Sequence, residues 1–228
     1  IKKFDGKASG VLSLPHMPKI TLNYTKASTD YNTLSRTDGK DTYDADIALT
    51  FQRTWHILPK TITGKYTLVK SLTDYRPDNL MSLSNIYDTE ETSEYYSAKL
   101  SFIPWKGSSF VPSYSRKTVK EEKTPLLSSE TAMKYPKSLE QKAGFTSTFK
   151  FTKWFAPTVS YNVSTEESHN ISTNSITAGT ITRSYALGDI KTITRSAKGG
   201  ASLTINMNDL FPKKKLLKTM MLTASYSL

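Results

Sequence analysis

One local pattern occurs five times in this sequence: a segment of alternating apolar and polar residues leads into a proline-containing apolar stretch, and a second alternating segment follows. Self-similarity at a fixed interval indicates a supersecondary unit repeated along the chain. The intervals between the prolines are 44, 45, 53 and 55 residues. We therefore expect a single segment over residues 1–228, built of five hairpins. Their turns are predicted near Pro15, Pro59, Pro104, Pro157 and Pro212.

The alternating segments have the period of β-strands. In the second unit, Ile47, Leu49 and Phe51 alternate with polar residues such as Asp46 and Gln52. Period two, together with enrichment in Thr, Val, Ile, Tyr and Phe, is typical of strands with two unlike faces. Five hairpins give about ten strands, so the pattern predicts an all-β, antiparallel fold.

The stretches between the hairpins are long and polar. They cover residues 25–44, 71–94, 117–141 and 164–179 and are rich in Ser, Thr, Asp and Asn. Loops beyond about 12 to 15 residues are uncommon in compact domains. Short turns at one end of the strands and long loops at the other are typical of outer-membrane barrels. Strands of about 8 to 12 residues are also close to the ~9–11 that a tilted strand needs to cross a bilayer.

A soluble β-sandwich or a β-solenoid would show alternating strands and polar loops as well. The aromatic residues favour the membrane alternative, because Trp and Tyr prefer the membrane–water interface. The predicted interface residues are Trp55, Trp105, Trp154, Phe155, Tyr24, Tyr66 and Tyr96. We therefore predict an antiparallel transmembrane β-barrel. The sequence begins in a polar stretch without a leader and stops on an alternating segment, so we expect one arc of a larger barrel.

Alternation assigns the strand residues to two faces. The predicted lipid-facing residues are Ile47, Leu49, Phe51, Leu100, Phe102, Phe149, Phe151, Leu203, Ile205 and Leu222. The predicted lumen-facing residues are Gln52, Lys65, Lys99, Lys150 and Asn206.

Composition and motifs narrow the function classes. The chain has 31 Lys and Arg against 20 Asp and Glu, but the positive charges are scattered singly, so we expect no nucleic-acid partner. It has no cysteine, which excludes thiolate catalysis and Cys-ligated metals. The three histidines lie in separate units without zinc spacing, and neither a nucleophile elbow nor a phosphate loop occurs. We predict no catalytic residues, no metal and no cofactor, and the chain is not expected to be an enzyme.

The stretch GDIKTITRSAKGGASLTINMNDLFPKKKLLKTMMLTASYS at 188–227 combines a Gly-Asp loop, a Ser- and Ala-rich strand and a basic Phe-Pro turn. With the repeated proline-turn unit, it resembles the SprA (Sov) family of giant outer-membrane barrels of type IX secretion. The resemblance covers most of the chain in style, although few positions are diagnostic. It implies a protein-conducting channel in the bacterial outer membrane, with translocated protein cargo and with partner proteins that plug or cap the pore.

The sequence is also compatible with two other functions. The first is another outer-membrane transport barrel, of the lipopolysaccharide-assembly or TonB-receptor type, although the paired cysteines of the former and the plug domain of the latter are absent. The second is a secreted β-rich binding module that uses its loops for recognition. In the barrel alternatives, membrane lipid and lipopolysaccharide would be partners of the outer surface.

Overall fold

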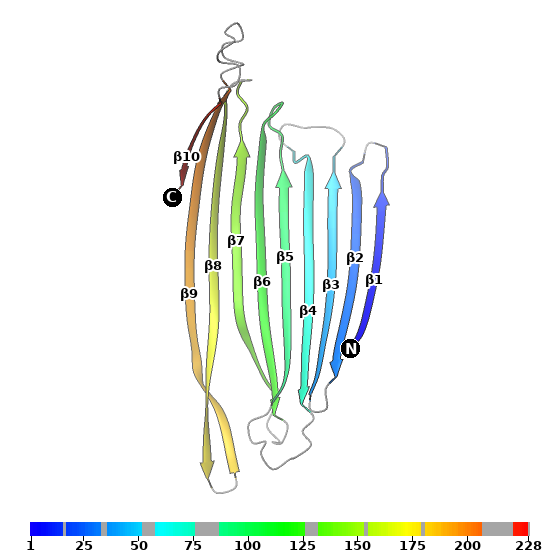
Figure 1. Cartoon of the computed structure of the whole chain (residues 1–228), viewed down its shortest axis with the longest axis vertical. Helices are drawn as coiled ribbons and strands as arrows, with labels where there is room; N and C mark the ends of the chain where they lie inside the picture. The colour runs from blue at the N-terminus through cyan, green and yellow to red at the C-terminus, as the bar shows by residue number, and fades with distance from the viewer. Residues whose placement is uncertain are drawn as a thin grey trace.

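The computed structural model shows ten β-strands in one sheet (Figure 1). It describes residues 1–15, 17–32, 36–51, 58–75, 87–125, 132–152, 155–178, 181–206 and 221–227. The strands are β1 (Lys2–Leu12), β2 (Lys19–Asn32), β3 (Arg36–Thr50), β4 (Thr61–Tyr75), β5 (Tyr87–Ser101), β6 (Ser109–Pro125), β7 (Met133–Thr148), β8 (Phe155–Ala178), β9 (Ile181–Asn206) and β10 (Met221–Ser227).

Each strand pairs with the next one in the sequence, so the order across the sheet is β1 to β10, and every pair is antiparallel. This confirms the predicted all-β, antiparallel architecture. The strands β1 and β10 form opposite edges, and no pairing between described residues joins them. The sheet is therefore open, and closure into a barrel is not part of the structure.

Three of the predicted proline turns lie where they were expected. Pro15 lies between β1 and β2, Pro59 between β3 and β4, and Pro104 between β5 and β6. We call this end of the sheet, at the top of Figure 1, the turn end, and the opposite end the loop end. The prediction for Pro157 is wrong, because this residue lies within β8 opposite Leu203, and the turn comes earlier, between the end of β7 at Thr148 and the start of β8 at Phe155. Pro212 lies outside the described residues.

The prediction of four long polar loops is wrong in extent. Residues 25–44 lie mostly in β2 and β3, and residues 164–178 lie entirely in β8. The strands β2 to β7 have 14 to 17 residues, while β8 has 24 and β9 has 26. The backbone ladder does not require an apolar face, so strands continue into regions where both faces are polar and the period-two signal disappears.

The β8–β9 hairpin extends beyond its neighbours at the loop end. Pairing of β8 with β9 continues to Ala178↔Ile181, whereas pairing of β7 with β8 stops at Ser138↔Ser168. Figure 1 shows this hairpin projecting past the other strands.

The sheet is a single layer. Among the described residues, Val119 is the one hydrophobic residue that is buried, at 7% exposure. The accessible surface is 16126 Å², whereas a globular protein of 25.6 kDa would expose about 10,400 Å². Large apolar side chains therefore lie on a surface and not in a core. None of the described residues forms a helix long and apolar enough to cross a membrane.

Candidate functional site

The register of the strands divides their side chains between two unlike faces. Residues directly opposite each other in a ladder point to the same side of a sheet. Ile47 lies opposite Gly64, which lies opposite Ala98. Continued across the sheet, this row contains Gly10, Leu22, Ile47, Gly64, Ala98, Tyr114, Ala143, Val163 and Ala197. Every member is Gly, aliphatic or aromatic, so we call this side the apolar face and the other side the polar face.

The apolar face carries a continuous apolar belt near the turn end. Leu49 lies opposite Ile62 and Ile62 opposite Leu100, while Leu22 and Ile47 are 53% and 42% exposed. The belt consists of Leu12, Ile20, Leu22, Ala45, Ile47, Leu49, Ile62, Gly64, Ala98, Leu100, Phe110, Pro112, Ala143, Phe145, Val159, Leu203 and Ile205. On β3 it extends from Ala45 to Leu49, about 14 Å at ~3.4 Å per residue. No described residue covers it with a second layer.

A row of tyrosines borders the apolar belt on the side of the loop end. Tyr24 lies opposite Ala45, Ala45 opposite Tyr66, and Tyr66 opposite Tyr96. The next residue of the row is Arg116, whose guanidinium carbon lies 5.9 Å from the centre of the Tyr96 ring. A cation over an aromatic face is stabilised by the ring quadrupole. The Nε atom of Arg116 is buried and has no hydrogen-bond partner among the described residues.

Beyond the tyrosine row the same face becomes charged. On β2 the apolar-face residues change from Ile20, Leu22 and Tyr24 to Lys26 and, further on, Asp30. The charged residues of the apolar face beyond the row include Lys26, Asp30, Asp41, Lys70, Glu90, Glu94, Lys120, Glu122 and Lys134. Within this charged band, Lys134 Nζ lies 3.2 Å from Glu122 Oε2.

An aromatic cluster joins two turns at the turn end. Trp105, between β5 and β6, stacks on Phe149 and also contacts Phe151, with ring centres 5.7 Å apart in both cases. The Trp105 indole donates a hydrogen bond of 2.8 Å to the carbonyl of Lys150. The backbone N–H of Lys150 donates one of 2.7 Å to Ser108 Oγ. The ring contacts and the two hydrogen bonds hold together segments that are about 45 residues apart.

Gly107 allows this turn to form. Its φ is +85°, a left-handed conformation that favours glycine. A Cβ at this position would lie 2.8 Å from Lys150 Cδ. The turn between β5 and β6 therefore depends on a glycine both for its backbone angle and for its contact with the neighbouring turn.

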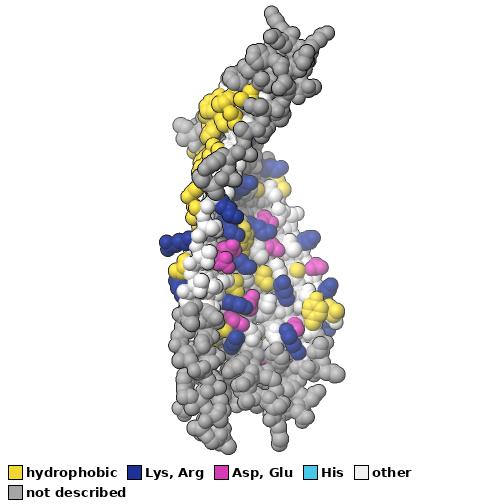
Figure 2. Space-filling model, turned by 60° about the vertical axis from the view of Figure 1, so that its left-hand side comes forward, with side chains coloured by type: hydrophobic (Ala, Val, Ile, Leu, Met, Phe, Trp, Pro, Cys, Tyr) yellow, Lys and Arg dark blue, Asp and Glu magenta, His cyan; other side chains and the backbone are white. Residues whose placement is uncertain are grey.

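The polar face is dominated by hydroxyl and charged side chains. Lys65 Nζ lies 3.9 Å from Asp44 Oδ1 and 4.0 Å from Asp46 Oδ1. Thr67 donates a hydrogen bond of 2.6 Å to Asp44. Ser and Thr occupy most of the remaining positions, including Thr21, Thr61, Thr63, Ser97, Ser113, Ser115, Thr146, Thr158, Ser160, Ser164, Ser196 and Ser202. In Figure 2, Lys and Arg (blue) and Asp and Glu (magenta) side chains are interspersed over the middle of the visible surface, with hydrophobic ones (yellow) between some of them.

Ion pairs are frequent in the loop-end half. Lys137 Nζ lies 2.5 Å from Glu91 Oε2, and this hydrogen bond raises the pKa of Lys137. On β8, Glu167 contacts both Lys191 and His169, at 2.5 and 2.8 Å. The hydrogen bond from Lys191 is the main cause that lowers the pKa of Glu167. These groups lie outside the apolar belt, where water solvates them.

Most of the predicted site residues that the structure describes can be assigned to one of the two faces or to a turn. Ile47, Leu49, Leu100, Leu203 and Ile205 lie on the apolar face, whereas Lys65 and Lys99 lie on the polar face. Phe51, Phe102, Phe149 and Phe151 lie in or beside the turns, and Phe155 begins β8. Trp55, Trp154 and Gln52 lie outside the described residues, and for Leu222 and Asn206 only the backbone is described.

Lys150 does not occupy the strand position that its lumen-facing assignment assumed. It lies in the turn after β7, which ends at Thr148. Sequence reasoning also missed apolar-face residues of β6 and β8, including Phe110, Tyr114 and Val159. The alternation of residues 155–163 was a usable signal for β8, but the assignment of Pro157 to a turn hid it.

The described residues contain no group of three or more His, Asp or Glu side chains that could hold a metal ion. The arrangement offers an exposed apolar surface and a hydroxyl-rich surface on opposite sides of one sheet. No protein-family model matches this chain, and no curated protein is detectably similar to it.

Proposed function

We propose that this chain forms an arc of the wall of a β-barrel in the bacterial outer membrane, and that the barrel is a channel for protein export. The apolar face contacts lipid, and the polar face lines the aqueous interior. The sheet continues into further strands at its two edges, because a spanning sheet must satisfy all its backbone groups within the bilayer.

The exposed apolar belt is the observation that carries this proposal. Monomeric soluble proteins rarely expose contiguous apolar patches larger than a few hundred Å². The belt crosses nine strands and lies between the tyrosine row and the aromatic cluster at the turn end, and outer-membrane barrels have an apolar band flanked in this way by aromatic girdles. The tyrosine row at its border matches the aromatic girdle expected at a membrane interface. The aromatic cluster around Trp105 takes the equivalent place at the turn end.

The polar face supports a water-filled interior. Its Ser and Thr hydroxyls and its paired charges, such as Lys65 with Asp44, need water or each other as partners. Single residues alternate between the two faces on every strand, which is the arrangement of a barrel wall with a wet lumen. An export role rests on the resemblance to the SprA family, which implies protein cargo and partner proteins that plug or cap the pore.

The absence of cysteine in the chain allows a direct test of the two faces. Ile47→Cys and Ala48→Cys place single thiols on opposite faces of adjacent residues in β3. In a form of the natural full-length protein that carries no other cysteine, inserted in native membranes, a membrane-impermeant maleimide should label the Ala48→Cys variant from the lumen about tenfold faster than the Ile47→Cys variant. After denaturation in detergent both variants should react equally, which serves as the control. Equal labelling in intact membranes, or recovery of the protein in the aqueous fraction without detergent, would refute the proposal.

Export is tested separately from membrane insertion. Deletion of the gene should cause secreted proteins to accumulate in the periplasm, and expression of the natural protein should restore their release. If the protein is inserted in the membrane and its deletion leaves the secreted proteins unchanged, the wall assignment stands and the export role is wrong.

A further inference from the structure

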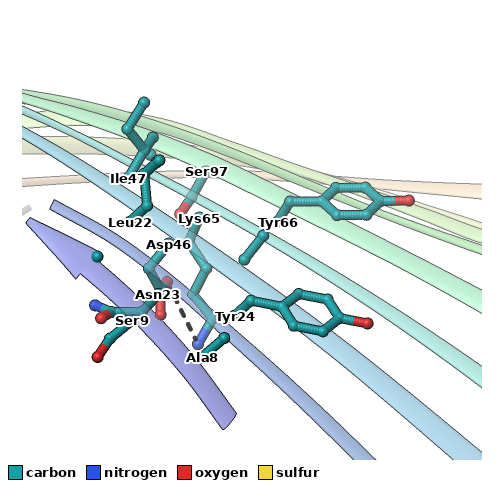
Figure 3. A pocket seen from close by; sticks show the side chains of 13 residues that line it. Ala8, Ser9, Leu22, Asn23, Tyr24, Asp46, Ile47, Lys65, Tyr66 and Ser97 are labelled. Carbon is teal, nitrogen blue, oxygen red and sulfur yellow. Dashed lines mark ion pairs between the residues drawn. The ribbon is translucent and has the colours of Figure 1, made fainter. Parts of the chain in front are cut away.

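A hollow of about 590 Å³ lies on the apolar face of β1 to β4, and its volume is within the ~300–1,000 Å³ of ligand sites. Figure 3 shows the rings of Tyr24 and Tyr66 extending side by side, with Leu22 and Ile47 next to them on the same side of the strands. Lys65 and Asp46 meet on the opposite side. The hollow is therefore a feature of the apolar face, bordered by the tyrosine row.

Small residues create the hollow. Ala45 lies between Tyr24 and Tyr66 in the tyrosine row, and Gly64 lies between Ile47 and Ala98 in the next row. Ala8 and Gly10 extend the small surface onto β1. A Cβ at Gly10 would meet nothing within 4 Å, so this part of the surface is open. Large side chains beside small ones thus leave a recess with apolar walls.

A lysine lies directly beyond the hollow on the side of the loop end. Lys26 follows Tyr24 on the same face of β2, and its Nζ lies 5.2 Å from the centre of the Tyr43 ring. Among the described residues Lys26 makes no ion pair, although Asp41 and Lys70 are present in the next row. The site thus combines an apolar recess with a cation at one end, which is complementary to an amphipathic anion.

We infer that this hollow holds an acyl chain of a membrane lipid whose anionic phosphate headgroup is bound by Lys26. The inference rests on the proposed function, because it requires the apolar face to contact lipid. The acyl chain lies over Ala45 and Gly64 and points toward the turn end. The headgroup lies at the level where the apolar belt gives way to the charged band. Lys26 supplies a charge-assisted contact to the phosphate, and the Tyr43 ring holds the ammonium group in place.

The test uses vesicles of phosphatidylcholine that contain a small fraction of phosphatidylglycerol with a photoactivatable acyl chain. The full-length protein is reconstituted, irradiated and digested, and crosslinks are mapped to peptides. The expected result is crosslinking concentrated on β3 and β4 around Ala45 and Gly64. Ala45→Leu fills the hollow and keeps the surface apolar, so crosslinking there should fall about tenfold. Ala143→Leu, on the same face outside the hollow, should leave it unchanged.

The headgroup is tested with Lys26→Gln, with Lys70→Gln as the matched control. Lys26→Gln should reduce the preference for phosphatidylglycerol over a phosphatidylcholine probe about fivefold, and Lys70→Gln should not. If Ala45→Leu fails to fold, Gly10→Leu provides a second filling variant. Unchanged crosslinking in the filled variants of inserted protein would overturn the inference and leave the proposed function intact. Failure of the wild-type protein to insert would overturn the proposed function itself.

Discussion

The turn-end half and the loop-end half of the sheet share the same strands but present different surfaces on the apolar face. On β2 the residues of this face are Ile20, Leu22 and Tyr24 in one half, and Lys26 and Asp30 in the other. The hydrogen-bonded ladder with β3 continues without interruption through this change. The change is therefore not required by strand pairing, because a ladder forms equally well with either set of side chains.

The position of this change is shared by neighbouring strands. Tyr24, Tyr66 and Tyr96 mark it on β2, β4 and β5, and Arg116 marks it on β6. A boundary at a common height across strands is the pattern that a change of surroundings at this level would produce. The proposed membrane accounts for this boundary.

The largest effect is expected from an arginine placed on each side of the boundary. Ile47 and Leu72 lie on the apolar face with 42% and 43% exposure, the former in the turn-end half and the latter in the loop-end half. Ile47→Arg should lower the free energy of unfolding in lipid vesicles by about 2–4 kcal/mol, the cost of Arg near a bilayer midplane. Leu72→Arg should lower it by only about 0–1 kcal/mol.

Reversible denaturation by guanidinium in lipid vesicles measures both variants. Because the two side chains are equally exposed in the isolated sheet, a protein in water would show similar and small losses for both. Equal losses in vesicles would therefore remove the distinction between the two halves.

Replacing one glycine by alanine in each half tests how closely the neighbouring backbone approaches there. A Cβ at Gly144, in the turn-end half, would lie 2.6 Å from the carbonyl oxygen of Tyr161 and 2.2 Å from Asn162 Oδ1. Gly144→Ala should therefore lower the free energy of unfolding by about 1–3 kcal/mol, since a backbone atom must move. At Gly39, in the loop-end half, the nearest atom is Asp30 Oδ1 at 3.6 Å. Gly39→Ala should be neutral or stabilise by up to about 1 kcal/mol. A neutral Gly144→Ala would show that these strands separate easily.

The sequence predicted the turn-end half better than the loop-end half, for a physical reason. Alternation is visible only where one face is apolar, as in residues 45–51, so the strands were recognised near the turn end. The sequence of residues 164–178 shows no regular alternation and resembles a loop, although its backbone pairs with β9 at every residue except Ser172, where the register shifts. Pro157 misled the assignment because it lies near the start of β8, one of the places where a sheet tolerates proline.

The sequence predicted individual residues of the candidate site, but not how they are arranged next to one another on the apolar face. Tyr24, Tyr66 and Tyr96 were recognised singly, and their common row follows from the register of four strands. Register depends on the lengths of the connections, and the true lengths differed from those expected, with three residues between β2 and β3. The hollow over Ala45 and Gly64 has the same origin, since small residues form a recess only when the register places them beside one another.

The aromatic cluster at the turn end allows a smaller perturbation. Trp105→Phe keeps a ring against Phe149 but removes the donor to the Lys150 carbonyl. The free energy of unfolding should fall by about 0.5–1.5 kcal/mol, the net value of one hydrogen bond. The variant removes one of the three tryptophans of the chain, which changes the fluorescence signal itself, so unfolding is followed by circular dichroism. Tyr135→Phe, which removes the hydrogen bond to Glu121 in the loop-end half, is the matched control. A loss confined to the control would contradict a structural role for the turn cluster.

The smallest effect is expected from the exposed ion pair of Lys137 and Glu91 in the loop-end half. Their side chains are 47% and 37% exposed, so water screens the pair, and Lys137→Gln should lower the free energy of unfolding by only about 0.2–1 kcal/mol.

The pKa of Lys137 is raised from 10.5, chiefly by the hydrogen bond to Glu91. A raised pKa in the folded state means that the contribution is complete below pH 10.5 and is lost as the pH rises above it. The difference between wild type and Lys137→Gln should therefore be constant from about pH 7 to 9 and be lost as the pH rises through the raised pKa of Lys137. Because the loop-end half is proposed to lie in water, molar salt should reduce the difference as well. A difference that persists in high salt would place this pair in a medium of low dielectric constant, and the boundary at the tyrosine row would then be wrong.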